Sequence, residues 1–179
     1  MISVILPIYN EEKGLTSFID DLYIQMKNIG QSFEIILVND GSTDKSLQLI
    51  QSLCTNYAEL KFIGFSRNFG HQIAISAGID YASGDQVILM DSDGQDPPEV
   101  IPDLIHKMDE GYDVVYAKRI KRAKESVMKK WTASLFYKIL NKITSIEIPV
   151  DTGDFRIINR KVIDALKQMP EKQRYLRGQ

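Results

Sequence analysis

The sequence predicts an α/β fold in which a mostly parallel sheet is flanked by helices. Apolar runs alternate with amphipathic stretches through the first two thirds of the chain. Runs such as Ile35-Ile36-Leu37-Val38 are apolar at every position, which is typical of strands buried on both faces. Because strands and helices alternate, we expect right-handed crossovers between neighbouring parallel strands.

The elements follow from this alternation in chain order. Strands are expected at the apolar runs Ser3–Ile8, Phe33–Asn39, Lys61–Ser66, Gln86–Met90 and Asp113–Ala117. The amphipathic stretches between them predict helices at about Gly14–Ile29, Thr43–Tyr57, Gln72–Tyr81 and Glu99–Glu110. Ser42 or Thr43 can cap the second helix, because a hydroxyl oxygen accepts bonds from the first helical N–H groups. The Pro97-Pro98 pair is expected to open the fourth helix, since proline fits the first helical turn.

Length and composition indicate a single globular domain. A chain of 179 residues that is 44% hydrophobic and 26% charged can form a substantial core. A net charge of −2 favours neither a nucleic acid nor a membrane as partner. The single Cys54 excludes an internal disulfide and fits a reducing cytoplasm. No run approaches the roughly 20 apolar residues of a membrane-spanning helix, and the N-terminus lacks the pattern of a secretory signal.

An acidic segment, Asp91–Asp96, directly follows a strand that is expected to be buried. Asp91 and Asp93 repel each other unless a cation lies between them, and oxygen ligands suit a hard ion such as Mg²⁺ or Mn²⁺. An acidic turn in which Asp96 or Ser92 caps the next helix is the alternative. The segment alone does not decide between these two interpretations.

Polar residues also follow the other expected strands. They are Tyr9-Asn10-Glu11, Asn39-Asp40-Gly41-Ser42 and Arg67-Asn68. Each segment alone also fits an ordinary turn. In open α/β sheets, however, ligands bind beyond the carboxyl ends of the strands. The convergence of these segments with the acidic one predicts a functional site at that edge.

These segments belong to blocks that carry a family resemblance. The blocks are Val4–Glu12, Glu34–Asp44, Ser66–Gln72, Asp91–Glu99 and Asp151–Arg156. With them in this order, the chain resembles the inverting, nucleotide-sugar-dependent glycosyltransferases of family two. It is most similar to the branch of dolichol-phosphate mannose synthase and the bacterial polyprenyl-phosphate glucosyltransferases. The resemblance implies a GT-A fold, with residues 1–179 forming one catalytic domain, and transfer of a hexose from a UDP-glucose-like donor to a polyprenyl phosphate.

The resemblance implies roles for the residues at the strand ends. Pro7, Tyr9 and Glu11 would border the base and ribose. Asp40 would accept hydrogen bonds from the nucleoside, with Val38 alongside. A tight turn with a helix cap is the alternative interpretation of the segment around Asp40, and both roles can coexist.

The resemblance also implies a metal site and further donor contacts. Asp91, Asp93 and Gln95 would hold Mg²⁺ or Mn²⁺ on the diphosphate, where the cation neutralises the leaving group. Ser92 and Arg119 would complete the donor-binding set. Gly94 stands where relatives often carry leucine, a departure that removes no ligand.

The segment Arg67–Gln72 is expected to open a helix, so its backbone N–H groups can meet a phosphate. His71 is interpreted as a structural or capping residue. The sequence gives no support for a histidine metal site.

A basic stretch follows the fifth expected strand. It contains Lys118, Arg119, Lys121, Arg122, Lys124, Lys129 and Lys130, and an amphipathic helix begins near Trp131. A solvated charge run is one interpretation; contact with an anionic bilayer, at about 1 kcal/mol per basic residue, is the other. The resemblance implies that Arg119 contacts a donor or acceptor phosphate. By the same resemblance, Lys129, Lys130, Arg174 and Arg177 would contact the acceptor or close over the diphosphate.

Inversion at a hydroxyl acceptor needs a carboxylate that removes a proton. Asp154 is the preferred candidate and Asp151 the second. The alternative is that these aspartates cap the segment before Arg160 and pair with Arg156. A phosphate acceptor is largely dianionic at pH 7, so Asp154 would then chiefly orient the acceptor or the sugar.

Relatives of this branch normally continue into membrane-associated helices. Three interpretations of this chain therefore stay open: an excised catalytic domain, a truncated gene product, or a protein that docks on a separate membrane subunit. In each case the resemblance implies a location in the cytoplasm, peripheral at the inner face of the membrane.

Other functions stay in view. A family-two transferase that extends a surface glycan at a hydroxyl, or a non-catalytic nucleotide-sugar-binding module, would share these blocks. A nucleotidyltransferase is disfavoured because the loop Tyr9–Gly14 is acidic rather than rich in glycine and basic residues. An oxidoreductase of the dinucleotide-binding class is disfavoured because no Gly-x-Gly-x-x-Gly follows the first strand.

Overall fold

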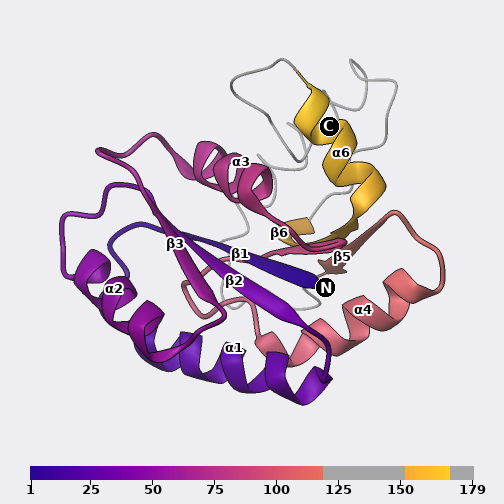
Figure 1. Ribbon diagram of the computed structural model, residues 1–179, viewed down its shortest axis with the longest axis horizontal. Coiled ribbons are helices and arrows are strands. Elements are labelled where there is room, and N and C mark those ends of the chain that lie inside the picture. Colours follow the sequence, from indigo (N-terminus) through magenta and orange to yellow (C-terminus); the bar gives the residue numbers. More distant parts are fainter. Residues whose placement is uncertain (119–151, 170–179) are drawn as a thin grey trace, which may run out of the picture.

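A computed structural model describes residues 1–118 and 152–169 of the chain (Figure 1). The elements, in chain order, are β1 (Ile2–Ile8), α1 (Leu15–Ile29), β2 (Phe33–Asn39), α2 (Ser46–Asn56), β3 (Leu60–Gly64), α3 (His71–Tyr81), β4 (Gln86–Leu89), a short 3₁₀ helix (Pro98–Val100), α4 (Ile101–Asp109), β5 (Val114–Lys118), β6 (Thr152–Asn159) and α6 (Arg160–Gln168). The strands and helices expected up to residue 118 are present, with shifts of a few residues at the ends, and the helix expected near Trp131 lies outside the described residues. Strand β6 and helix α6 were not predicted.

The strands form one mixed sheet of six strands in the order β3-β2-β1-β4-β6-β5. Strands β1, β2, β3 and β4 pair in parallel. Strand β6 runs antiparallel to both of its neighbours, β4 and β5. The prediction of a mostly parallel sheet is therefore confirmed, and the antiparallel β6 inserts between the strands expected fourth and fifth.

Helices cover both faces of the sheet (Figure 1). Helices α1, α2 and α4 pack on one face, where Ile19 and Leu22 are fully buried. Helices α3 and α6 pack on the other, with Ile75 and Ile163 in the core. Burial of each such side chain stabilises the fold by about 1.5–3 kcal/mol relative to exposure. Within the described residues, no helix is both long and apolar enough to cross a bilayer.

Of the two predictions about helix starts, the one for α2 is wrong and the one for α4 is confirmed. Neither Ser42 nor Thr43 caps α2, because the helix begins later and the Asp44 carboxylate accepts the Ser46 N–H instead, at 2.9 Å. Pro98 does open the helical region of α4, as the first residue of the 3₁₀ turn. Ser42 and Thr43 therefore belong to the loop between β2 and α2, at the edge of the sheet.

Candidate active site

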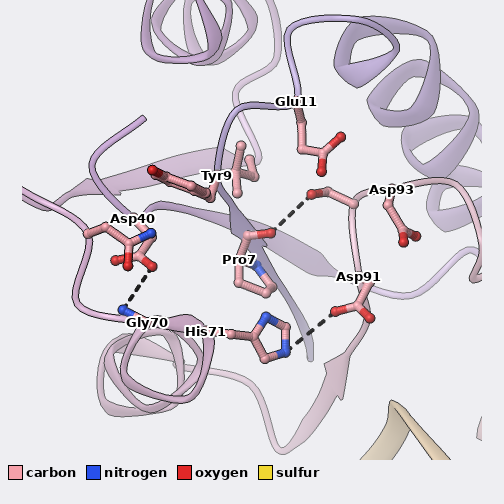
Figure 2. A pocket seen from close by; sticks show the side chains of 11 residues that line it. Pro7, Tyr9, Glu11, Asp40, Gly70, His71, Asp91 and Asp93 are labelled. Carbon is pink, nitrogen blue, oxygen red and sulfur yellow. Dashed lines mark hydrogen bonds and ion pairs between the residues drawn. The ribbon is translucent and has the colours of Figure 1, made fainter. Parts of the chain in front are cut away.

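A cavity of about 380 Å³ lies at the carboxyl ends of β1, β2 and β4, beside the start of α3 (Figure 2). Its lining residues are Pro7, Ile8, Tyr9, Glu11, Asp40, Asn68, Gly70, His71, Asp91, Ser92 and Asp93. Polar segments from four separate parts of the sequence therefore meet at one edge of the sheet, as expected from the topology.

The loops after β1 and β2 are joined by hydrogen bonds through Asn10. Its backbone N–H donates to Ser42 Oγ at 3.0 Å, and its Oδ1 accepts the Thr43 N–H at 2.8 Å. Asn10 has a positive φ of 58°, a conformation that asparagine tolerates better than most residues. This junction sets the backbone positions of Tyr9 and Glu11 on either side of it.

Asp40 lines the cavity but is also bonded to the protein backbone. Its carboxylate is buried and accepts the N–H groups of Phe69 and Gly70, at 2.7 and 3.0 Å. Those two N–H groups, which were expected to meet a phosphate, are therefore occupied by Asp40. Gly41 allows the backbone of Arg67 to lie close to the loop after β2, because a Cβ on Gly41 would lie 2.2 Å from the Arg67 carbonyl carbon.

The acidic segment after β4 is held by its own side chains. The buried Ser92 donates its hydroxyl to the Pro7 carbonyl at 3.0 Å, which ties the end of β4 to the end of β1. The buried Asp96 accepts the Asp91 N–H at 3.0 Å. The N-cap residues of the 3₁₀ helix and of α4 are Pro97 and Val100, and neither makes a side-chain cap bond. Capping by Ser92 or Asp96 stays a prediction.

Carboxylates face one another across this cavity (Figure 2). Burial raises the pKa of Asp91 to about 6; the charge of His71 opposes this, and Asp96, Asp154 and Asp93 add to it. Burial, followed by repulsion from Asp93, also raises the pKa of Glu11. A bound cation would relieve this repulsion, and the oxygen donors of Asp91 and Asp93 suit Mg²⁺ or Mn²⁺.

Among the described residues of the predicted donor and metal sets, two do not line the cavity. Val38 is fully buried in the core between the sheet and α3, so its side chain does not lie alongside a ligand in the cavity. Gln95 is exposed and absent from the lining, while its N–H donates to Asp93 Oδ1 at 2.9 Å. Its role as a third metal ligand stays a prediction.

His71, which the sequence analysis interpreted as a structural or capping residue, lines the cavity. Its Nε2 lies 3.1 Å from Asp154 Oδ2 and 3.5 Å from Asp91 Oδ1. One ligand atom from each of these three residues lies within 4.8 Å of the others, a spacing that a cation could bridge. The sequence alone did not support a histidine site, because nothing in it shows which strand His71 faces in the fold.

Asp154 lies on β6, is 3% exposed and is not part of the cavity lining. Its Oδ1 lies 3.3 Å from Arg156 Nη2, which confirms the predicted pairing. It does not cap α6, because Asn159 Oδ1 accepts the Val162 N–H there. Its role as a general base stays a prediction.

The other predicted site residues lie outside the described part of the chain. They are Asp151, Arg119, Lys129, Lys130, Arg174 and Arg177.

Comparisons with known proteins show to which family this chain belongs. The model of the family "Glycosyl transferase family 2" matches residues 3–167. The uncharacterized glycosyltransferase YkcC of Bacillus subtilis (strain 168) is 47% identical over 176 residues, which are 98% of this chain and 54% of that protein. The bactoprenol glucosyl transferase of Shigella phage SfV is 40% identical over 177 residues, or 99% of this chain and 58% of that protein. The chain thus spans about half the length of the curated relatives it matches.

A solved structure supports the fold assignment. The mannosyltransferase PcManGT from Pyrobaculum calidifontis, in complex with GDP-Man and Mn²⁺, matches with a TM-score of 0.66 and 18% identity, over 94% of this chain and 47% of that one. This likeness shows the GT-A fold. With the family match extending over residues 3–167, the chain belongs to glycosyltransferase family 2.

Proposed function

We propose that this chain catalyses metal-dependent, inverting transfer of a hexose from a UDP-glucose-like donor to a polyprenyl phosphate. The observation that carries the proposal is the acidic cavity at the ends of β1, β2 and β4, in a chain that belongs to this family. The 40% identity to a bactoprenol glucosyl transferase supports a polyprenyl phosphate as acceptor.

The donor would occupy the cavity between the loops after β1 and β2 and the acidic segment. Pro7, Tyr9 and Glu11 would border the nucleoside, and Asp40 can accept further hydrogen bonds, since each carboxylate oxygen has two lone pairs. Asp91 and Asp93 would hold Mg²⁺ or Mn²⁺. When bound, the cation would neutralise the charge of the leaving nucleoside diphosphate.

The surroundings of Asp154 support a phosphate rather than a hydroxyl acceptor. A general base must reach the proton that it removes, whereas Asp154 is buried and pairs with Arg156 and His71. A phosphate with a second pKa near 6 is largely deprotonated at pH 7 and needs little such help. Because a polyprenyl phosphate is carried by a bilayer, the proposed reaction would take place at the inner face of the membrane. Residues 1–179 would form one catalytic domain.

A transfer assay tests the proposal. The chain is incubated with radiolabelled UDP-glucose, GDP-mannose or dTDP-glucose, with Mn²⁺ or EDTA, and with either undecaprenyl phosphate in detergent or an alkyl glucoside. We expect Mn²⁺-dependent labelling of the lipid phosphate, fastest with UDP-glucose. Equal labelling in EDTA, or labelling of the alkyl glucoside alone, would contradict the proposal.

A further inference from the structure

Helix α3 carries His71 into the cavity at its first residue. The bonds from Phe69 and Gly70 to the buried Asp40 fix the backbone immediately before the helix. In Figure 2 the imidazole of His71 points toward Asp91 across the cavity. The position of the ring is therefore set by β2 and α3 together.

The Nε2 atom of His71 lies between two carboxylates from different strand ends. Asp91 follows β4 and lines the cavity, whereas Asp154 is in β6 and is buried behind it. The separations of 3.1 Å to Asp154 Oδ2 and 3.5 Å to Asp91 Oδ1 leave one imidazole nitrogen in contact with both. The ring thus connects the cavity to the interior of the sheet.

Asp154 is held on its other side by Arg156, with both side chains 3% exposed. A carboxylate held by a buried ion pair has a fixed orientation, and while it is ionised it accepts hydrogen bonds and donates none. A hydrogen on His71 Nε2 that is donated to Asp154 then fixes the rotation of the imidazole, in the way that buried carboxylates orient histidines elsewhere.

We infer that His71 is a positioning residue for sugar transfer, an inference that rests on the function proposed above. Its imidazole, fixed by the bond to Asp154, lies 3.5 Å from Asp91 Oδ1 and limits the orientations that the Asp91 carboxylate can take. The Asp91 carboxylate therefore keeps one orientation toward the donor diphosphate and its cation. The competing role for His71 is that of a metal ligand. The two roles exclude each other, because one Nε2 atom cannot both donate a hydrogen and coordinate an ion.

Two variants separate the hydrogen bond from the space that the ring fills. His71→Gln keeps an N–H donor at a similar reach, and His71→Leu keeps the bulk without a donor. We expect His71→Leu to lower kcat about 100-fold, the scale that misplacement of about 1 Å produces, with KM for UDP-glucose changed less than about threefold. His71→Gln should recover at least about tenfold of that loss. His106→Gln, at a histidine whose side chain is 79% exposed, is the control and should keep the wild-type kcat.

A spectrum of the histidine rings tests the contact without any substrate. The chain contains 2 histidines, so loss of one set of ¹⁵N ring signals in His106→Gln assigns the other set to His71. We expect Nε2 of His71 to carry a hydrogen with and without Mg²⁺, and its signal to shift in Asp154→Asn. Loss of that hydrogen on addition of Mg²⁺ would overturn the inference in favour of a metal ligand.

The outcomes distinguish this inference from the proposed function. Wild-type kcat in His71→Leu, or equal losses in His71→Leu and His71→Gln, would overturn the positioning role while the transfer activity stands. Absence of transfer by the wild-type chain would overturn the proposed function and this role with it. The ring spectrum would then still report whether the link to Asp154 exists. Thermal melting of each variant verifies that it is folded.

Discussion

At the scale of single residues, Asp40 and Ser92 line the cavity while their hydrogen bonds hold the fold around it. Asp40 orders the start of α3, and Ser92 joins the ends of β4 and β1. Substitution of either residue would therefore change ligand contacts and loop order together. Asp93 is a cleaner probe of ligand binding, because it is exposed and its one described side-chain bond is to the nearby Gln95 N–H.

Glu34 gives a residue-scale prediction about pH. It is buried on β2 and accepts hydrogen bonds from Ser3 Oγ, Lys61 Nζ and the Ser83 N–H. Burial alone would raise its pKa, but the bond from Lys61 and the other two bonds outweigh burial and lower it. The ionised folded form is thus favoured, and its stabilisation is present above the usual glutamate pKa of about 4.3 and lost as pH falls through the lower folded value.

We expect Glu34→Gln to lower the free energy of unfolding by about 2 kcal/mol at pH 7. The difference from the wild type should shrink as the pH falls below about 4. Urea titrations at pH 7 and pH 3.5 measure both values. Glu99→Gln, at an exposed position, serves as control and should change little. A difference that grows toward low pH would contradict the assignment.

At the scale of elements, α3 must lie close to β1 for His71 to reach the cavity. Gly78 makes this possible, because a Cβ added there would lie 2.3 Å from Ile5 Cγ2. Alanine is a better helix former than glycine, so a loss of stability on substitution must come from this contact. The packing of the helix and the placement of the histidine are therefore linked.

We expect Gly78→Ala to lower the free energy of unfolding by about 1–3 kcal/mol, the usual range for overpacking. Because removal of the Ile5 side chain opens that space, Gly78→Ala combined with Ile5→Ala should be more stable than the sum of the single variants predicts. Chemical denaturation of the four proteins gives the coupling energy. Strictly additive losses would show that the two residues do not meet.

Strand β6 marks how far the sequence could predict the elements. The parallel strands were predictable because their apolar runs are continuous, and the cavity was predictable because parallel strands end at a common edge. In β6, Asp154 and Arg156 interrupt the apolar run, and they are buried as an ion pair. The contact of His71 with Asp154 joins positions 83 residues apart and depends on the antiparallel insertion of β6, which no local pattern encodes.

At the scale of the whole molecule, the net charge of −2 conceals a strong local imbalance. Glu11, Asp40, Asp91 and Asp93 line the cavity, and no lysine or arginine is among the described residues that line it. A nucleoside diphosphate brings further negative charge. The fold therefore concentrates carboxylates at a cost in stability, and a bound cation would offset that cost.

Asp91→Asn tests this balance between stability and ligand binding. With EDTA and no nucleotide, the variant should melt about 2–4 °C above the wild type, because removal of a partly buried charge beside Asp93, Asp96 and Asp154 is worth about 1 kcal/mol. With Mn²⁺ and UDP at about 100 times Kd, the wild type should gain about 2.7 kcal/mol and the variant much less, so the order of melting temperatures reverses. Asp109→Asn removes one exposed charge from α4 and should follow the wild type in both conditions, measured by differential scanning calorimetry. If Asp91→Asn melted below the wild type in EDTA, or gained as much from Mn²⁺ and UDP, Asp91 would be a structural carboxylate and the cation site would have to be sought elsewhere in the cavity.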